Sequence, residues 1–370
     1  MTRERDRFMD FLRVASLAIV VAGHWLAIVP YVENGIAGGR MLYNVDPRFW
    51  PVTGIFQVIP LFFFVGGFAN FTSYASLRAA GDEDRFWSHR LRRLLVPTLV
   101  LLGCWLGLEA VLNILEVGGP GPLRGMKLGN ITPFAALWFL GVYLGLVLLA
   151  PATIRFHQRF GVWVPVGLVG SVALVDLLAF GLDHPSLLGV NIILVWLIPH
   201  QLGYFYADGR LRRLSTGWLL AIAGLALLAV LLLTSLPIYG RNLLDNGVTL
   251  IGITAPTLPF AVLCLLIVAL ALIARRPLTA WLARRTPWRV VNAANSIVMT
   301  VFLWHMTAYF AVVVALAGMG ASLPAGPDAV WWLERPLFLL LPALVLVPLV
   351  WVFGRFERPA ARRRSAAVAG

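Results

Sequence analysis

The stretch DFLRVASLAIVVAGHW, residues 10–25, is an apolar run that carries two ionisable side chains, Arg13 and His24. It follows a basic leader and is long enough to begin crossing a lipid bilayer. His24 follows Arg13 by eleven positions, which corresponds to about three helical turns and roughly 16 Å of rise. Eleven steps of about 100° return almost to the starting angle, so both side chains lie on one stripe of the helix.

Two interpretations of this stripe are open. Ionisable groups in membrane helices are costly and by default indicate a functional site that faces a polar interior. A histidine exchanges protons near neutral pH, so His24 suits the work of a general base. In the other interpretation Arg13 extends to the membrane surface and fixes orientation, while His24 is a hydrogen-bonded packing residue.

The composition of the whole chain is that of a polytopic helical membrane protein. Its 370 residues are 60% hydrophobic and 13% charged, and the mean hydropathy is +0.84. Repeated apolar runs of about twenty residues predict membrane-spanning helices. The net charge of +13 comes from arginines clustered between those runs, a pattern that encodes orientation and does not indicate a nucleic-acid partner. Neither the two cysteines nor any other residues show the spacing of a disulfide framework or a metal site.

We expect an all-α fold with ten spans and both termini in the cytoplasm. The predicted spans are residues 8–30, 50–74, 94–117, 134–152, 161–181, 190–207, 215–234, 256–274, 294–318 and 330–354. With the N-terminus inside, the inner segments hold 23 of the 30 Lys and Arg residues, and Arg13 lies within the first span. The outer segments hold the other six, which are Arg40, Arg48, Arg124, Lys127, Arg241 and Arg335. Such an excess on inner loops sets the orientation.

The ends of the chain carry two further expectations. The first apolar segment has an arginine-rich leader, but no small-residue cleavage site follows it, so we expect an uncleaved anchor. We expect residues 1–356 to form one transmembrane domain. Residues 357–370 are rich in arginine and alanine and are expected to form a basic, disordered cytoplasmic tail.

Two motifs lie near the predicted inner surface. Gly66-Gly67 in the second span lacks side chains and allows a backbone or a ligand to approach closely, although small residues also serve plain helix packing. Arg90 and Arg93 at the start of the third span share a helix face. Neighbouring guanidinium groups bind phosphates through bidentate hydrogen bonds. The alternative is that these two arginines only supply orienting charge or contact anionic lipids.

Two more histidines lie within predicted spans. His305 in the ninth span is about 16 residues from Arg289, and His24 is about 17 residues from Arg7, so the two imidazoles are expected at similar depth. His200 lies in the sixth span. Each is either a proton-handling group or a core histidine with satisfied hydrogen bonds. The sequence contains no Gly-rich phosphate loop, serine nucleophile motif or metal-ligand spacing.

In combination these motifs resemble the acyltransferase 3 family of integral membrane acyltransferases. The resemblance rests on Arg13 and His24 with ten residues between them, Phe62–Phe68, Arg90–Arg93 with Pro97, Leu137-Trp138-Phe139-Leu140 and Leu303-Trp304-His305. It spans most of the chain, in the family's order and with the family's ten helices. Many members have Ser-Gly-Phe where this chain has Gly66-Gly67-Phe68, so a hydroxyl contact at residue 66 is absent.

The resemblance implies an enzyme of the cell membrane that moves an acyl group, commonly acetyl, from cytoplasmic acyl-CoA to a carbohydrate or lipid-linked acceptor. It implies that His24 is the catalytic base or a transient acyl carrier, with Arg13 as its motif partner. The donor-site residues that it implies are Arg90, Arg93, Gly66 and Gly67. His305, Trp138 and His200 are candidates for substrate binding or structural support. Acyl-CoA is the expected donor co-substrate, the bilayer is the expected surrounding, and no metal is expected.

Two other classes of function remain open from the sequence. A proton-coupled transporter or flippase of a sugar or lipid would use the intramembrane histidines as a proton relay. No internal repeat is visible, which argues against the many transporter folds that are built from repeats. A membrane scaffold without chemistry would need none of the histidines.

Overall fold

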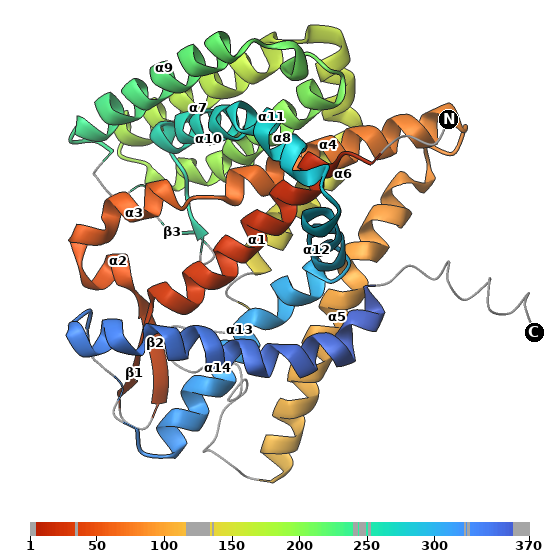
Figure 1. Cartoon of the computed structure of the whole chain (residues 1–370). Helices are drawn as coiled ribbons and strands as arrows, with labels where there is room; N and C mark the ends of the chain where they lie inside the picture. Colours follow the sequence, from red (N-terminus) through yellow and green to blue (C-terminus); the bar gives the residue numbers. More distant parts are fainter. Residues whose placement is uncertain are drawn as a thin grey trace, which may run out of the picture. The chain divides into compact units, whose positions relative to one another are not determined.

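A computed structural model of the chain describes residues 5–33, 36–115, 134, 137–239, 243, 249–250, 253–321, 323 and 326–357. The chain groups into two compact units, which we describe separately. Unit 1 comprises Met1–Val20, Asp46–Arg90 and Trp138–Val291, and unit 2 comprises Val21–Val45, Leu91–Leu137 and Asn292–Gly370. Figure 1 labels the elements in chain order. The extent of the transmembrane domain stays a prediction, and all but the first residue of the predicted tail lie outside the described residues.

Among the described residues, eight helices are long and apolar enough to span a membrane, and a bent helix pair makes a ninth candidate. The eight are α1 (Arg7–Ala27), α5 (Arg85–Ile114), α6 (Leu137–Phe160), α7 (Trp163–Gly181), the segment Pro185–Ala207 that contains α8 (Asn191–Ala207), α9 (Thr216–Ser235), α13 (Val298–Gly318) and α14 (Ala329–Phe353). The bent pair is α10 (Leu258–Ile273) with α11 (Arg275–Leu282), at 48°. The remaining predicted span corresponds to α4 (Ile59–Ala79), a helix of 21 residues. The prediction of an all-α polytopic membrane protein is confirmed.

The second predicted span begins later than expected. A 3-10 helix, η1 (Pro47–Phe49), and the short helix α3 (Trp50–Ile55) precede α4. Pro51 and Pro60 each lie in the first turn of a helix, where the missing N–H needs no partner and the ring favours a start. The prediction of one continuous helix over residues 50–74 was therefore wrong at its N-terminal end.

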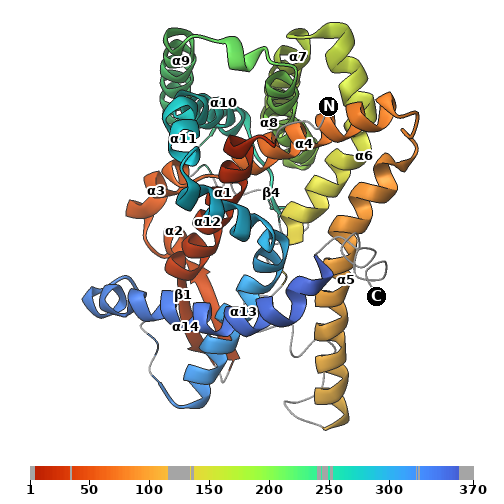
Figure 2. The ribbon, with the colours of Figure 1, turned by 45° about the vertical axis from the view of Figure 1, so that its right-hand side comes forward.

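In unit 1, α4 packs against α8 and α9 packs against α10 (Figure 2). Two glycines allow the α4–α8 contact. A Cβ on Gly67 would lie 1.9 Å from the carbonyl oxygen of His200, and a Cβ on Gly203 would lie 2.2 Å from that of Phe64. Membrane helices pack closely through small residues, because lipid supplies little hydrophobic drive between them. The packing interpretation of Gly67 therefore accounts for its geometry.

The segment between α10 and α13, predicted as an inner loop, forms α11 and α12 (Arg285–Asn295). Both helices contact the start of α1 within unit 1. Arg7 donates a hydrogen bond to the carbonyl oxygen of Leu282 at 2.9 Å, and its guanidinium lies 4.9 Å from the ring centre of Trp288. Arg7 of the basic leader is thus held by specific contacts.

In unit 2, α13 packs against α14, and a hairpin follows α1. Its strands β1 (Ile28–Glu33) and β2 (Ile36–Met41) pair antiparallel, and β2 contacts α13. Trp304 of α13 stacks on Phe353 of α14 with ring centres 3.9 Å apart. Glu357 accepts hydrogen bonds from the backbone N–H groups of Met299 and Thr300, a favourable place for a carboxylate because helix N-termini carry partial positive charge. This contact fixes the start of α13.

The smaller elements complete the fold. They are α2 (Leu42–Val45), η2 (Pro185–Val190), η3 (Leu211–Arg213), η4 (Gly354–Phe356) and the strand pair β3 (Thr249–Leu250) with β4 (Ile253–Thr254). Neither hairpin was predicted, and together they contribute only short strands to a helical protein.

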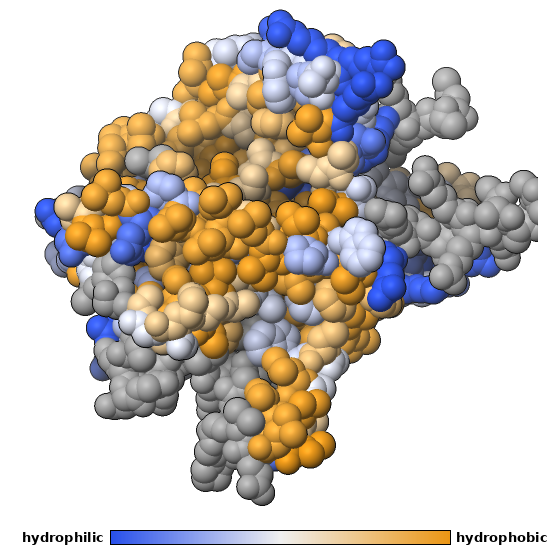
Figure 3. Space-filling view, turned by 60° about the horizontal axis from the view of Figure 1, so that its bottom comes forward, coloured by the Kyte–Doolittle hydropathy of each residue, from blue (hydrophilic) through white to orange (hydrophobic). Residues whose placement is uncertain are grey.

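Large apolar side chains are exposed along the spanning helices. Leu225, Leu333 and Trp351 are 69%, 80% and 84% exposed. Figure 3 shows one face on which apolar side chains cover much of the surface. Water-soluble monomers rarely expose apolar patches of this kind, and a lipid environment is the solvent that suits them. The chain is a multi-pass membrane protein.

Candidate functional site

His24 and His305 lie side by side in unit 2. His24 is on α1 and is part-buried, and His305 is on α13 and is fully buried. Nδ1 of His24 is 2.9 Å from Nε2 of His305. The ring planes are within 7° of parallel while the ring centres are 5.2 Å apart. The two imidazoles therefore meet edge to edge, with the N–H of one ring directed at the lone pair of the other, and are not stacked face to face.

The hydrogen bonds of this pair assign the positions of its protons. Nδ1 of His305 is 2.6 Å from the carbonyl oxygen of Phe302. A carbonyl only accepts, so Nδ1 of His305 carries the hydrogen, and in the neutral ring Nε2 is then an acceptor. Nδ1 of His24 must consequently donate to it. The remaining nitrogen of His24, Nε2, holds a lone pair and has no hydrogen-bond partner among the described residues.

A neighbouring tryptophan holds the two helices together at this point. The indole Nε1 of Trp25 donates to the carbonyl oxygen of His305 at 3.1 Å, and the Trp25 side chain is 5% exposed. Because Trp25 directly follows His24, this bond fixes α1 against α13 next to the imidazoles. The stacking of Trp304 on Phe353 supports α13 from its other neighbour.

This arrangement can perform proton transfer. A neutral imidazole with a free lone pair accepts a proton, and a second group that bonds to its other nitrogen sets the tautomer and orientation. His305 is placed to orient the ring of His24, since it bonds to Nδ1 of His24, is buried, and has its own tautomer fixed by a backbone carbonyl. The sequence predicted similar depths for His24 and His305, and the structure places them in direct contact.

The three predicted arginines, Arg13, Arg90 and Arg93, differ in exposure and in the unit to which they belong. Arg13 is part-buried on α1 and belongs to unit 1. Arg93 is exposed on α5 in unit 2. Arg90, three residues earlier, belongs to unit 1 and is part-buried. Of the two arginines predicted to bind phosphate, Arg93 is thus exposed, whereas Arg90 is part-buried.

Arg90 takes part in a second polar cluster, in unit 1. Its Nε donates to Oδ1 of Asn70 at 2.8 Å, and Nη2 donates to the same oxygen and to the hydroxyl of Tyr143. These bonds orient the amide so that Nδ2 of Asn70 donates to Nε2 of His200 at 2.9 Å. His200 therefore carries its proton on Nδ1, which is buried and has no partner among the described residues. This histidine can donate a proton but has no free lone pair.

Gly66 and Trp138 lie near this cluster and serve packing. A Cβ on Gly66 would lie 2.5 Å from the ring of Tyr143. Trp138 packs beside Trp196, with ring centres 6.0 Å apart, in an aromatic core that includes Phe63. The structure brings Gly66, Gly67, His200 and Arg90 together in unit 1, and His24 with His305 in unit 2.

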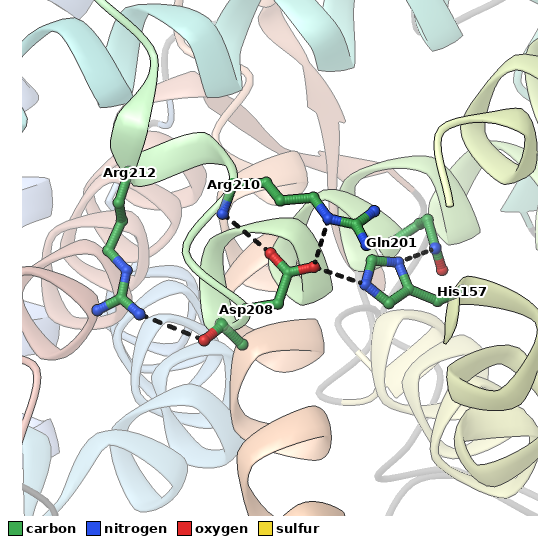
Figure 4. A network of polar contacts seen from close by, with 6 residues as sticks. His157, Gln201, Asp208, Arg210 and Arg212 are labelled. Atoms are coloured by element: carbon green, nitrogen blue, oxygen red, sulfur yellow. Dashed lines mark hydrogen bonds and ion pairs between the residues drawn. The ribbon is translucent and has the colours of Figure 1, made fainter. Parts of the chain in front are cut away.

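A third histidine system was not predicted (Figure 4). Nε2 of Gln201 lies 2.7 Å from Nδ1 of His157, and Nε2 of His157 lies 3.0 Å from Oδ2 of Asp208. The amide of Gln201 donates, so His157 accepts on Nδ1 and donates from Nε2. Arg210 pairs with the same carboxylate at 3.2 Å. Both ring nitrogens are used.

Sequence reasoning missed the side chains that partner the histidines. Asn70 follows Gly66 by one helical turn and so shares its face, which is a signal that could have identified it. Gln201 and Asp208 lack such a signal, because their partner His157 was not among the predicted site residues. In the described part of the chain no group of three His, Cys, Asp or Glu residues is placed to hold a metal ion.

Comparison with known proteins gives one match. The model of the acyltransferase 3 family, described as an acyltransferase domain, matches residues 6–356, nearly the whole chain. No curated protein and no solved structure matches the chain. Every predicted site residue, from Arg13 to His305, lies within the matched range.

Proposed function

Because the chain belongs to the acyltransferase 3 family and is an acyl-transferring enzyme, we propose that it moves an acyl group, acetyl in the first instance, from cytoplasmic acyl-CoA to a hydroxyl of a carbohydrate or lipid-linked acceptor. The proposed location is the cell membrane. His24 is the proposed general base, and no metal enters the proposal.

One observation carries the assignment of His24. Its tautomer leaves Nε2 unprotonated, while Nδ1 is bonded to a buried imidazole. A hydroxyl is a poor nucleophile until a base removes its proton, and a positioned base contributes about 10²–10⁴-fold to the rate. Of the histidines described above, His157 and His200 have no free lone pair. His24 therefore fits the task best.

The proposed reaction is addition of the acceptor hydroxyl to the thioester followed by loss of the CoA thiol. The acceptor oxygen forms a bond to the thioester carbon while its proton moves to Nε2 of His24. The carbonyl electrons move onto oxygen and give a tetrahedral intermediate. When they return, the carbon–sulfur bond breaks, and His24 gives its proton to the sulfur of CoA. In an alternative mechanism the acyl group is first carried on Nε2 of His24. Trapping of this acyl-histidine by rapid acid quench would distinguish it from direct attack by the acceptor.

For the donor, the proposal keeps both arginines of the sequence motif. Arg93 is exposed on α5, so its guanidinium is accessible to the phosphates of CoA. Arg90 is braced by Asn70 and Tyr143, and a guanidinium with a fixed orientation loses less freedom on binding. Arg13 stays the proposed motif partner of His24. Each is tested separately by the donor Kd of its alanine variant.

The test uses the full chain, purified and reconstituted in liposomes with acetyl-CoA and a panel of sugar and lipid-linked acceptors. Release of the CoA thiol and the mass of the acceptor are both measured. We expect both to increase with wild type, to be lost in His24→Ala, and to persist in His184→Ala, a matched control at an exposed histidine. Acceptor flux without acylation would support transport instead. No thiol release above empty liposomes would contradict the proposal.

A further inference from the structure

Arg335 is a buried charge in a membrane helix. The sequence places it among the outer-segment charges, but it lies on α14 and is 4% exposed. A charged side chain inside a membrane helix is costly and indicates a functional site by default. The burial of this side chain therefore needs an explanation beyond the orientation of the helix.

The contacts of Arg335 use most of its guanidinium. Nε donates to the carbonyl oxygen of Trp331 at 3.0 Å, and Nη1 donates to that of Ile28 at 3.3 Å. The rings of Trp331 and Phe338 lie 4.0 and 4.2 Å from the guanidinium carbon. Nη2 is buried and has no hydrogen-bond partner among the described residues. An unmade bond from a buried charged donor is expensive, and such groups in folded proteins call for an explanation.

The guanidinium is joined through Ile28 and Tyr309 to the two chain segments that carry the histidine pair, within unit 2. Ile28, which accepts from Arg335, follows His24 by four residues. The hydroxyl of Tyr309 donates to the same carbonyl oxygen at 3.3 Å, and Tyr309 follows His305 by four residues. Tyr309 and His305 lie four apart on one face of α13, at about 6 Å of rise. Ile28 is the first residue of β1, directly after the end of α1. The shared carbonyl of Ile28 and the hydroxyl of Tyr309 therefore place the cation about one turn of α13 from His305.

We propose that Arg335 is a catalytic residue, whose Nη2 donates a hydrogen bond to the oxyanion that forms on the thioester carbonyl while His24 holds the acceptor proton. This rests on the proposed function. In the addition step a full negative charge appears on one oxygen, and a pre-placed donor in a dry site stabilises such charge strongly. When the carbon–sulfur bond breaks, the carbonyl returns and the charge at Arg335 is again unpaired.

The single free nitrogen decides the kind of ligand. Phosphates and carboxylates are bound by two nitrogens of the guanidinium fork, whereas here Nε and Nη1 are committed to backbone carbonyls. One nitrogen suits one oxygen, and the reacting carbonyl supplies one. The bonds to Trp331 and Ile28 hold the fork in place, so the donor needs no reorganisation when the charge develops.

The experiment compares Arg335→Met with Tyr309→Phe in the reconstituted enzyme. The methionine removes the charge and keeps an apolar stem, while Tyr309→Phe keeps the guanidinium and removes the neighbouring hydroxyl that contacts both Ile28 and Arg335. We expect Arg335→Met to lower kcat by about 10²–10³-fold, as removal of an oxyanion donor does, with an unchanged KM for acetyl-CoA. Tyr309→Phe should keep most of kcat. Thermal melting of both variants reports their folding.

A second variant decides the matter if Arg335→Met does not fold. Arg335→Lys keeps the charge but lacks the planar fork that holds one nitrogen on a backbone carbonyl and a second one free, so its donor is not held in place, and we expect kcat to fall by about tenfold or more. A wild-type kcat in either folded variant overturns the inference, and so does a loss that Tyr309→Phe reproduces with the same drop in melting temperature. Neither result affects the proposed function, which fails only if wild type transfers no acyl group or His24→Ala retains transfer.

Discussion

Two histidine systems in this protein differ in how many of their ring nitrogens are hydrogen-bonded. In unit 1, His157 accepts from Gln201 and donates to Asp208, so both of its nitrogens are occupied. In unit 2, the bonds run from His24 to His305 and end on a carbonyl, which leaves one lone pair on His24 free. The number of occupied nitrogens separates a histidine that holds helices together from one that can take a proton, and burial does not.

His200 is an intermediate case. Its Nε2 accepts from Asn70, and its Nδ1 keeps a hydrogen that has no partner among the described residues. Such a ring can donate a hydrogen bond but cannot act as a base without first losing that proton. Of the three systems, His24 can accept a proton, His200 can only donate a hydrogen bond, and His157 has both nitrogens occupied. Variants of these systems are therefore expected to differ in their effect on activity.

The largest effect is expected for His24→Ala. It removes the only free lone pair of the three systems, and we expect kcat to fall by about 10²–10⁴-fold while the melting temperature stays close to wild type. Steady-state kinetics and thermal unfolding in detergent measure the two. Near-normal turnover at normal protein level would contradict the assignment of His24 as the base.

A smaller loss of activity is expected for His305→Ala. The base remains, but its tautomer and orientation are no longer fixed, and we expect kcat to fall on the order of 10²-fold. The pH profile of kcat should change shape as well, because the hydrogen of His24 is then free to occupy either nitrogen. A loss larger than that of His24→Ala would assign the base to His305 instead.

Gly67→Ala tests whether the His200 system depends on packing. The new Cβ would lie 1.9 Å from the backbone oxygen of His200, so α4 and α8 must move apart, and overpacking costs about 1–3 kcal/mol of unfolding free energy. Gly224→Ala on α9 is the matched control, because nothing lies within 4 Å of its Cβ position. Equal melting temperatures of the two variants would contradict this account of the contact.

The smallest effect on activity is expected for His157→Ala. The change leaves Asp208 and Gln201 without their shared partner, which costs about 1–3 kcal/mol for buried polar groups, and turnover per folded molecule should stay near wild type. Denaturation and kinetics on one preparation separate the two quantities. A loss of turnover without a loss of stability would show that occupied nitrogens do not define a structural histidine here.

The sequence predicted the helices well, because apolar periodicity and arginine clusters are local signals. It also predicted similar depths for His24 and His305, since helical rise converts residue number into depth, and the structure places the two rings in contact. The start of α4 was missed because Pro51 and Pro60 divide one apolar run into two helices. Local sequence does not tell a proline that begins a helix from one inside it, as Pro97 lies inside α5.

Side-chain partners could not be predicted in the same way. The bond from Asn70 to His200 and that from Gln201 to His157 join different helices, so they depend on how those helices pack. Arg335 shows the same limit, since a charge near the end of a span looks like an interface anchor until the burial of its side chain is known. Position along a helix follows from sequence, whereas the neighbour across the interface follows from tertiary structure.

The distance in sequence between α1 and its partners has a consequence for biosynthesis. Arg7 bonds to a residue 275 positions later, His24 to one 281 positions later, and Ile28 to one 307 positions later. At a synthesis rate of about 5–20 residues per second, His24 waits roughly 15–60 s for His305 after it leaves the ribosome. During that interval a polar side chain resides in the nascent membrane helix without its permanent neighbour. The first helix is therefore made long before the neighbour that bonds to its histidine in the finished fold.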